Sequence, residues 1–203
     1  MSIEIHHKLE MIYKNHKGML RLLALNGSLD LHKKARQDFF VHLSQIVVGQ
    51  QLSNAASNSI WARIEKLAAN QQSSLYDVFR PEYHHKLRAC GISRSKIKAI
   101  AGLREATGKN NISEEIFTST DHVIITTEIT KLWGFGKWSA EMVALSFFGL
   151  PNIWSDDDAA LIRAITIIAN DGAESAIQLI DMASPYKSYL AMHLWKAIDN
   201  KII

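Results

Sequence analysis

The chain has 203 residues and a mass of 22.8 kDa, which suits one domain or two small lobes. Apolar residues make up 47% and charged residues 21%, enough for a sizeable core, while three prolines and ten glycines disfavour disorder and turn-rich β folds. A single cysteine, Cys90, excludes an internal disulfide, a four-cysteine iron–sulfur site and a cysteine-based zinc site. Without an 18-residue apolar run or an apolar N-terminal signal core, we expect an intracellular protein with no membrane span.

Helical periodicity dominates the chain from end to end. Apolar residues recur with the spacing of one helix face, and Ser53 and Ser93 stand where they can cap the helices that follow. The run HVIITT at 122–127 is short and continuous with ITKLW, so we interpret it as helix. We predict an all-α protein with about ten short helices, near residues 2–25, 39–47, 53–67, 81–90, 93–108, 121–132, 138–149, 158–169, 172–182 and 186–200.

The net charge of +3 is small, but its distribution is uneven. The window 86–109 holds seven basic residues and one acid. This basic window has two possible interpretations. It is either a stripe of positive charge that binds a polyanion, or an ordinary helix face exposed to solvent.

The segment LWGFGKWSAEMVALSFFG has the most specific pattern. Gly134 and Gly136 lie between two predicted helices and permit a tight turn with positive φ. The N–H groups at the start of the second helix, together with Lys137, would favour a phosphate group. Such a contact would position a nucleic acid without reading its bases. The alternative is an ordinary turn between helices that uses glycine for packing.

Three acids, Asp156, Asp157 and Asp158, precede the apolar run AALIRAI. Acids in this position serve as N-cap and first-turn residues, favoured by the positive end of the helix dipole. The sequence therefore predicts that at least one of them caps the helix near 158–169.

Four motifs together resemble the helix–hairpin–helix DNA glycosylases. They are the Gly134–Gly136 hairpin with the downstream PNIWSDDDAALIRAI, IVVGQQLSNAASNSIWARI (46–64), LRACGISRSKIKAIAGL (87–103) and SPYKSYLAMHLW (184–195). They follow the family's order from about residue 38 to 198 and are most similar to the alkylated-base branch, the 3-methyladenine DNA glycosylase II type. The resemblance implies a two-lobed helical bundle with its active-site cleft between the lobes. One lobe would comprise 1–37 and 151–203, the other 38–150 with the helix–hairpin–helix at 121–149.

The resemblance implies a monofunctional glycosylase that flips an alkylated purine out of duplex DNA and hydrolyses its N-glycosidic bond in base excision repair. The partner would be double-stranded DNA carrying alkylated bases, and we expect a DNA-associated monomer that needs no cofactor. Bifunctional relatives carry a catalytic lysine where Trp138 stands, so water is the expected nucleophile. Two alternatives stay open: a DNA-binding module that has lost excision, and a lyase that uses Lys137.

Matching the family's pattern onto IWSDDD assigns the catalytic acid to Asp158, with Asp157 second by one position. A fixed anion there would stabilise the oxocarbenium-like transition state and orient or deprotonate the attacking water. The family usually has proline where Ser155 stands, which weakens the register.

The resemblance also assigns a base pocket. Trp138 and Tyr186 would hold a cationic alkylated base on their aromatic faces, and Met142 stands where some relatives have tyrosine. Ala159 replaces an aromatic residue of some relatives, so the pocket would be roomier. For each aromatic, packing in the core is the alternative.

The resemblance also assigns DNA contacts to two motifs, the GQQLS turn and the Gly134–Gly136 hairpin. Gln51, with Leu52 second, would fill the gap left by the flipped base, and Ser53 with its helix N-terminus would hold a phosphate. The alternative is that Gln50 and Gln51 end one helix and Ser53 caps the next. The further predicted DNA contacts are Gly134, Gly136, Lys137, Ser139 and Lys187, the last standing where relatives usually have arginine. The family also binds a monovalent cation, Na⁺ or K⁺, through hairpin carbonyls, which here would include Leu132 and Phe135.

Overall fold

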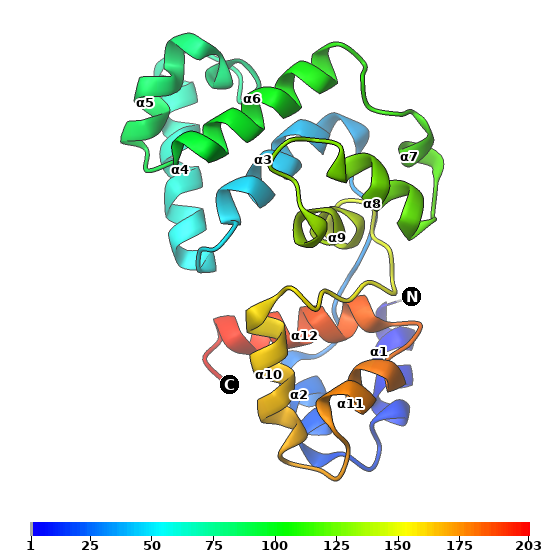
Figure 1. Cartoon of the computed structure of the whole chain (residues 1–203). Coiled ribbons are helices and arrows are strands. Elements are labelled where there is room, and N and C mark those ends of the chain that lie inside the picture. The colour runs from blue at the N-terminus through cyan, green and yellow to red at the C-terminus, as the bar shows by residue number, and fades with distance from the viewer. Residues whose placement is uncertain (1) are drawn as a thin grey trace. The chain divides into compact units, whose positions relative to one another are not determined.

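A computed structural model describes residues 2–203, and every regular element in that range is helical (Figure 1). The chain divides into two compact units, Met1–Lys33 with Ala144–Ile203, and Lys34–Val143. These boundaries differ by a few residues from the 37/38 and 150/151 that the sequence suggested. The all-α prediction is confirmed, including the helical state of HVIITT, which lies in α8 (His122–Thr130) behind the N-cap Asp121.

The first unit is a bundle arranged around α12, which packs against α2, α10 and α11. Its helices are α1 (Ser2–Ile12), α2 (Lys17–Asn26), α10 (Ala159–Ala169), α11 (Ala176–Met182) and α12 (Lys187–Asp199). Because α12 has neighbours on several sides, seven of its thirteen residues are buried, among them the polar Ser188 and His193.

The second unit is arranged around α3, which packs against α4 and α6. Its α-helices are α3 (Phe39–Gly49), α4 (Asn54–Asn70), α5 (His84–Ala89), α6 (Arg94–Gly108), α7 (Glu115–Thr118), α8 and the first turns of α9 (Lys137–Ser146). The 3-10 turns η1 (Arg36–Asp38), η2 (Asp77–Phe79) and η3 (Pro81–Tyr83) complete it. Most of α3 is apolar and buried, as expected of a central core helix.

The helix predicted over 2–25 is in fact two helices. His16 has extended backbone and its Nδ1 accepts the N–H of Met19, so it starts α2 as an N-cap. Gly18 in the first turn of α2 lies against Asp171, whose Cβ would be 2.9 Å from an added Cβ. The break therefore depends on a capping histidine and on a contact with a distant loop, neither of which the apolar periodicity reveals.

One predicted helix end is confirmed and one predicted helix start is corrected. α6 ends at Gly108, as expected, and the left-handed residue that follows is Asn110 with φ 53°. An added Cβ on Gly108 would lie 2.6 Å from the hydroxyl of Tyr76, so the glycine permits this close approach. The helix predicted from 172 begins only after Ser175, whose side chain forms a capping box with Gln178.

Candidate functional site

Asp158 is the N-cap of α10 and is nine-tenths buried, with 8% of its surface exposed. Its Oδ1 accepts the backbone N–H groups of Ala160 and Leu161, each at 3.0 Å. Asp156 and Asp157 are both exposed, and Asp156 accepts a hydrogen bond from the indole of Trp154. The structure therefore separates the three adjacent acids and places only Asp158 at the positive end of α10.

The loop that leads to Asp158 is fixed to the start of α12 by Ser188. The buried Ser188 hydroxyl donates to the carbonyl of Leu150 at 2.6 Å and accepts the N–H of Ile153 at 2.9 Å. The N–H of Ser188 donates to the carbonyl of Pro151 at 3.0 Å. These bonds fix the path of the chain a few residues before the carboxylate.

Ser155, which directly precedes the three aspartates, is fully buried. Its backbone carbonyl accepts the N–H of Asp158, but its hydroxyl has no hydrogen-bond partner among residues 2–203. The serine therefore keeps the backbone turn into Asp158 while burying an unsatisfied polar group.

Tyr186 and Lys187 lie where α12 begins, after the cis Ser184–Pro185 bond. The ammonium of Lys8 lies 5.7 Å from the centre of the Tyr186 ring, so one cation already faces this aromatic. Lys187 Nζ is 2.8 Å from a carboxylate oxygen of Asp181. This predicted phosphate ligand thus already has an anionic partner in its own unit.

In the second unit, the Gly134–Gly136 turn joins α8 to α9. Gly134 has φ +87°, and an added Cβ would lie 2.6 Å from the Cβ of Ala99 on α6. Gly136 does not have a positive φ, so the tight turn uses the left-handed conformation at Gly134 alone of the two glycines. Its carbonyl accepts the N–H of Ala140, and an added Cβ would meet nothing within 4 Å. Gly134 therefore allows the turn to pack closely against Ala99 of α6. Gly136 leaves open space beside the first N–H groups of α9.

Gln50 connects this turn to the end of α3. Its side-chain amide donates to the carbonyl of Gly134 at 2.9 Å and to the hydroxyl of Ser139 at 2.8 Å. Ser139 is buried, with 2% exposed, so its hydroxyl is an internal anchor and only its backbone could face a phosphate.

The turn between α3 and α4 carries the three residues predicted to fill the gap and hold a phosphate. Gln51 has φ +58°, a left-handed backbone that is uncommon for a residue with a Cβ, and it is exposed. Leu52 is 40% exposed. Ser53 caps α4 by accepting the N–H of Ala56 at 3.3 Å, as predicted.

Trp138 and Met142 lie four residues apart on α9 and so share one face of that helix. Trp138 is half-buried and Met142 is 8% exposed. Lys137 is exposed, with its Nζ 3.8 Å from a carboxylate oxygen of the buried Glu141.

The basic window 86–109 is largely tied to partners inside its own unit. Lys86, Arg88, Lys96, Arg104 and Lys109 each donate to a carbonyl, amide or carboxylate oxygen. Lys98 instead lies 4.2 Å from the centre of the exposed Trp133 ring, in the hairpin turn. Most of this charge therefore supports the fold.

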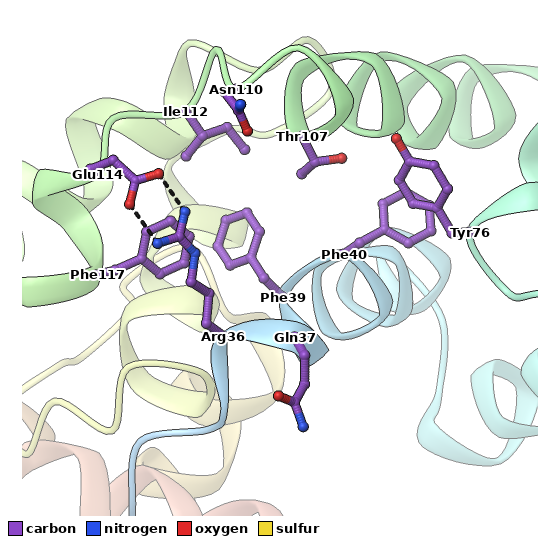
Figure 2. Close-up of a pocket in the computed structure, with 10 residues that line it drawn as sticks. All are labelled: Arg36, Gln37, Phe39, Phe40, Tyr76, Thr107, Asn110, Ile112, Glu114 and Phe117. Atoms are coloured by element: carbon purple, nitrogen blue, oxygen red, sulfur yellow. Dashed lines mark hydrogen bonds and ion pairs between the residues drawn. The ribbon is translucent and has the colours of Figure 1, made fainter.

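A cavity of about 260 Å³ in the second unit lies elsewhere, and none of the predicted site residues lines it. Figure 2 shows its aromatic lining and, at its edge, Arg36 paired with Glu114. The Arg36 guanidinium also lies 4.4 Å from the centre of the Phe117 ring.

Within residues 2–203, no three or more His, Cys, Asp or Glu side chains are grouped so that they could hold a metal ion. Over the same range, none of the helices combines the length and apolar character that crossing a bilayer requires.

Three polar residues make hydrogen bonds that the sequence did not predict: Gln50, Lys96 and Ser188. Each is a polar residue inside one of the four motifs, in GQQLS, G-x-S-x-x-K and P-Y-K-S respectively. Their place in the motifs indicated that they matter, but most of their partners are backbone groups, which no sequence pattern identifies.

The chain is similar to curated DNA-3-methyladenine glycosylases. It is 26% identical over 177 residues to the Saccharomyces cerevisiae protein, covering 82% of this chain and 60% of that one. It is 22% identical over 213 residues to DNA-3-methyladenine glycosylase 1 of Schizosaccharomyces pombe, covering 97% and 93%. No protein-family model matches the chain.

The fold agrees with these sequence relatives. The solved structure of the Schizosaccharomyces pombe 3-methyladenine DNA glycosylase in complex with abasic DNA superposes with a TM-score of 0.79, covering 97% of each chain at 22% identity. The sequence relatives and the common fold agree with the four ordered motifs: the chain is similar to DNA-3-methyladenine glycosylases along most of its length and has the fold of a solved member of that group.

Proposed function

We propose that this protein is a monofunctional DNA glycosylase that excises alkylated purines, of the 3-methyladenine and 7-methylguanine type, from duplex DNA in base excision repair. The observation that carries the proposal is Asp158, a nine-tenths buried carboxylate at the positive end of α10, on a loop fixed by Ser188. The glycosylase names of the relatives agree with it.

The reaction breaks the N-glycosidic bond, and its electron pair leaves with the base. A purine alkylated at N3 or N7 is cationic, so it departs as a neutral molecule while positive charge develops on the sugar. The carboxylate of Asp158 stabilises that charge and orients the water that adds to the anomeric carbon. The water loses a proton, and the products are the free base and an abasic site in an intact strand.

Base recognition is proposed for Trp138 and Met142 of the second unit and for Tyr186 of the first unit. Electron-rich ring faces favour a cationic purine over the neutral parent base, which supplies selectivity for alkylated bases. Lys8 already lies near the Tyr186 ring, so Trp138 is the stronger candidate for cation recognition.

Backbone contacts to DNA are assigned to the hairpin and the α3–α4 turn. The open space at Gly136 and the first N–H groups of α9 suit a phosphate, with the exposed Lys137 beside them. Gln51 is proposed to enter the base stack, with Leu52 as second candidate, because both are exposed and Gln51 has an unusual backbone conformation. The Ser53 cap offers a second helix N-terminus, and Lys187 would have to leave Asp181 to reach a phosphate.

A monovalent cation at the carbonyls of Leu132 and Phe135 is part of the same proposal. The Leu132 carbonyl accepts the Phe135 N–H at 3.0 Å, and its second lone pair can serve a cation. Such an ion would add positive charge near the phosphate. The N–H groups of the hairpin and Lys137 would supply the other favourable contacts to it.

The test measures free base released from duplex DNA containing 3-methyladenine or 7-methylguanine. Asp158→Asn keeps a good N-cap but removes the charge, so we expect base release to fall by about 10² or more while binding to an abasic-analogue duplex is retained. Asp157→Asn, one position away and exposed, is the matched control and should release base like the wild type.

Two outcomes would favour the alternatives. A wild-type protein that binds duplex DNA but releases no alkylated base would be a non-catalytic DNA-binding module. A covalent protein–DNA complex trapped by borohydride in the wild type, and lost in Lys137→Met, would make the protein a lyase.

A further inference from the structure

Lys96 and Gln50 form a continuous set of hydrogen bonds around the turn that carries Gln51. Lys96 Nζ donates to the carbonyls of Val48 and Gln50, each at 2.8 Å. The Gln50 side chain in turn donates to Gly134 and Ser139 of the hairpin. The α3–α4 turn and the hairpin are thus held by the same two residues.

Helix α6 supports both loops from one face. Lys96 and Ala99 are three residues apart and therefore lie on the same side of α6. Lys96 bonds to the α3–α4 turn, and Ala99 lies directly under Gly134, so close that any side chain there would clash.

The bonds of Lys96 meet a specific need of this turn. The last carbonyls of α3 have no partner within the helix, and they carry the negative end of its dipole. An ammonium group satisfies two carbonyls at once where the chain leaves α3, just before the left-handed Gln51. Burial lowers the pKa of Lys96, and the two carbonyls are the acceptors that its ammonium contacts.

We propose that Lys96 and Gln50 are positioning residues that fix Gln51 relative to the phosphate-binding hairpin, so that entry of Gln51 into the base stack is coupled to backbone binding. The inference rests on the proposed function for the roles of Gln51 and the hairpin. It explains why a lysine of the basic window points inward to carbonyls instead of outward to a phosphate.

The test uses a duplex with a tetrahydrofuran abasic analogue next to 2-aminopurine, whose fluorescence rises when the neighbouring base is unstacked. Lys96→Met removes both donors, and we expect at least about half of the fluorescence rise to be lost while affinity changes by less than about 3-fold. Lys96→Arg, which can still donate to both carbonyls, should recover the signal. Lys109→Met, at the exposed far end of α6, is the matched control.

A double-mutant cycle separates positioning from general destabilisation. If Lys96 acts through Gln51, then Lys96→Met should cost no further fluorescence in a Gln51→Ala background. A full fluorescence rise in Lys96→Met, or losses that add in the double variant, would overturn the proposal. If Lys96→Met does not fold, Gln50→Ala carries the same comparison, and a wild-type signal from it is equally decisive.

The measurement does not depend on excision. A wild-type protein that unstacks 2-aminopurine but releases no alkylated base would remove the proposed activity and leave the positioning role intact. If the wild type excises alkylated base and Lys96→Met unstacks 2-aminopurine as well as the wild type does, the proposed activity stands and the positioning role is overturned.

Discussion

The carboxylate of Asp158 has a structural task before any substrate arrives, because its Oδ1 accepts two N–H groups of α10. Those bonds hold the carboxylate in one orientation, which is what a preorganised electrostatic group requires. Asparagine caps helices about as well as aspartate, whereas alanine loses about 1 kcal/mol. The two substitutions at Asp158 therefore separate capping from charge: alanine should lower the melting temperature, and asparagine should leave it nearly unchanged.

A substitution at Ser155, in the same loop, is expected to change the stability of the protein. Its hydroxyl is buried without a partner, a state that costs about 1–3 kcal/mol. Ser155→Ala should therefore raise the free energy of unfolding by about 1 kcal/mol, measured by urea denaturation, with Asp158 still in place and base release retained. Ser175→Ala is the contrasting control, because it removes a serine whose hydroxyl caps α11 and should destabilise the protein. A loss of stability in Ser155→Ala would mean that the hydroxyl does have a partner.

At the scale of elements, the hairpin turn shows two glycines used for different reasons. Gly134 needs a positive φ and has no room for a Cβ, while Gly136 has ordinary backbone and open space. The bonds from Gln50 and the contact with Ala99 hold the turn against α3 and α6. The turn is therefore packed against neighbouring residues at Gly134 and open at Gly136.

A matched pair of substitutions tests this division. Gly134→Ala should cost about 2 kcal/mol or more of unfolding free energy, because the new Cβ meets Ala99 and the backbone is left-handed. Gly136→Ala should leave stability within about 0.5 kcal/mol but weaken binding to duplex DNA, since a methyl group would occupy the space proposed for the phosphate backbone. Chemical denaturation and fluorescence anisotropy measure the two effects. Equal stability losses in both variants would contradict the assignment.

At the scale of the whole molecule, each unit has a core of its own, and each contains a histidine that is shielded from water: His193 is buried and His42 is half-buried. Burial lowers the pKa of His193 in the first unit and of His42 in the second, in both cases to about 4. Asn26 bonds to His193 at both its ring and its carbonyl, while His6 and Lys196 add nearby positive charge. Both units therefore keep a neutral imidazole that the unfolded chain would protonate.

The free energy of unfolding should consequently fall as the pH is lowered below 6.5. Above the unfolded pKa of 6.5 both histidines are neutral in either state, and between pH 6.5 and 4 only the unfolded chain takes up protons. For His193 alone the loss is about 2 kcal/mol by pH 5. Thermal unfolding from pH 7.5 to 4.5 measures it, and His193→Gln should flatten the profile while His7→Gln, an exposed histidine, should not. A flat profile in the wild type would show that His193 is protonated in the folded state.

The sequence predicted most elements because helix periodicity and capping residues are local. Ser53, Ser93 and Asp121 cap helices as their side chains allow, and the three aspartates precede a helix. The continuous helix predicted over 2–25 was wrong, because the break before α2 involves a contact with a residue distant in the chain, that of Gly18 with Asp171.

The sequence by itself determined an all-helical protein, the hairpin and the acidic cap, since the backbone preferences and charges behind them act over a few residues. Only the tertiary structure decided which aspartate is buried, which glycine is left-handed, and that Lys96 and Gln50 bond to carbonyls of the two loops. Burial and hydrogen bonding to the backbone arise from packing between segments far apart in the chain. Because every residue has the same backbone carbonyl, the sequence does not indicate which carbonyl will accept a side-chain hydrogen bond.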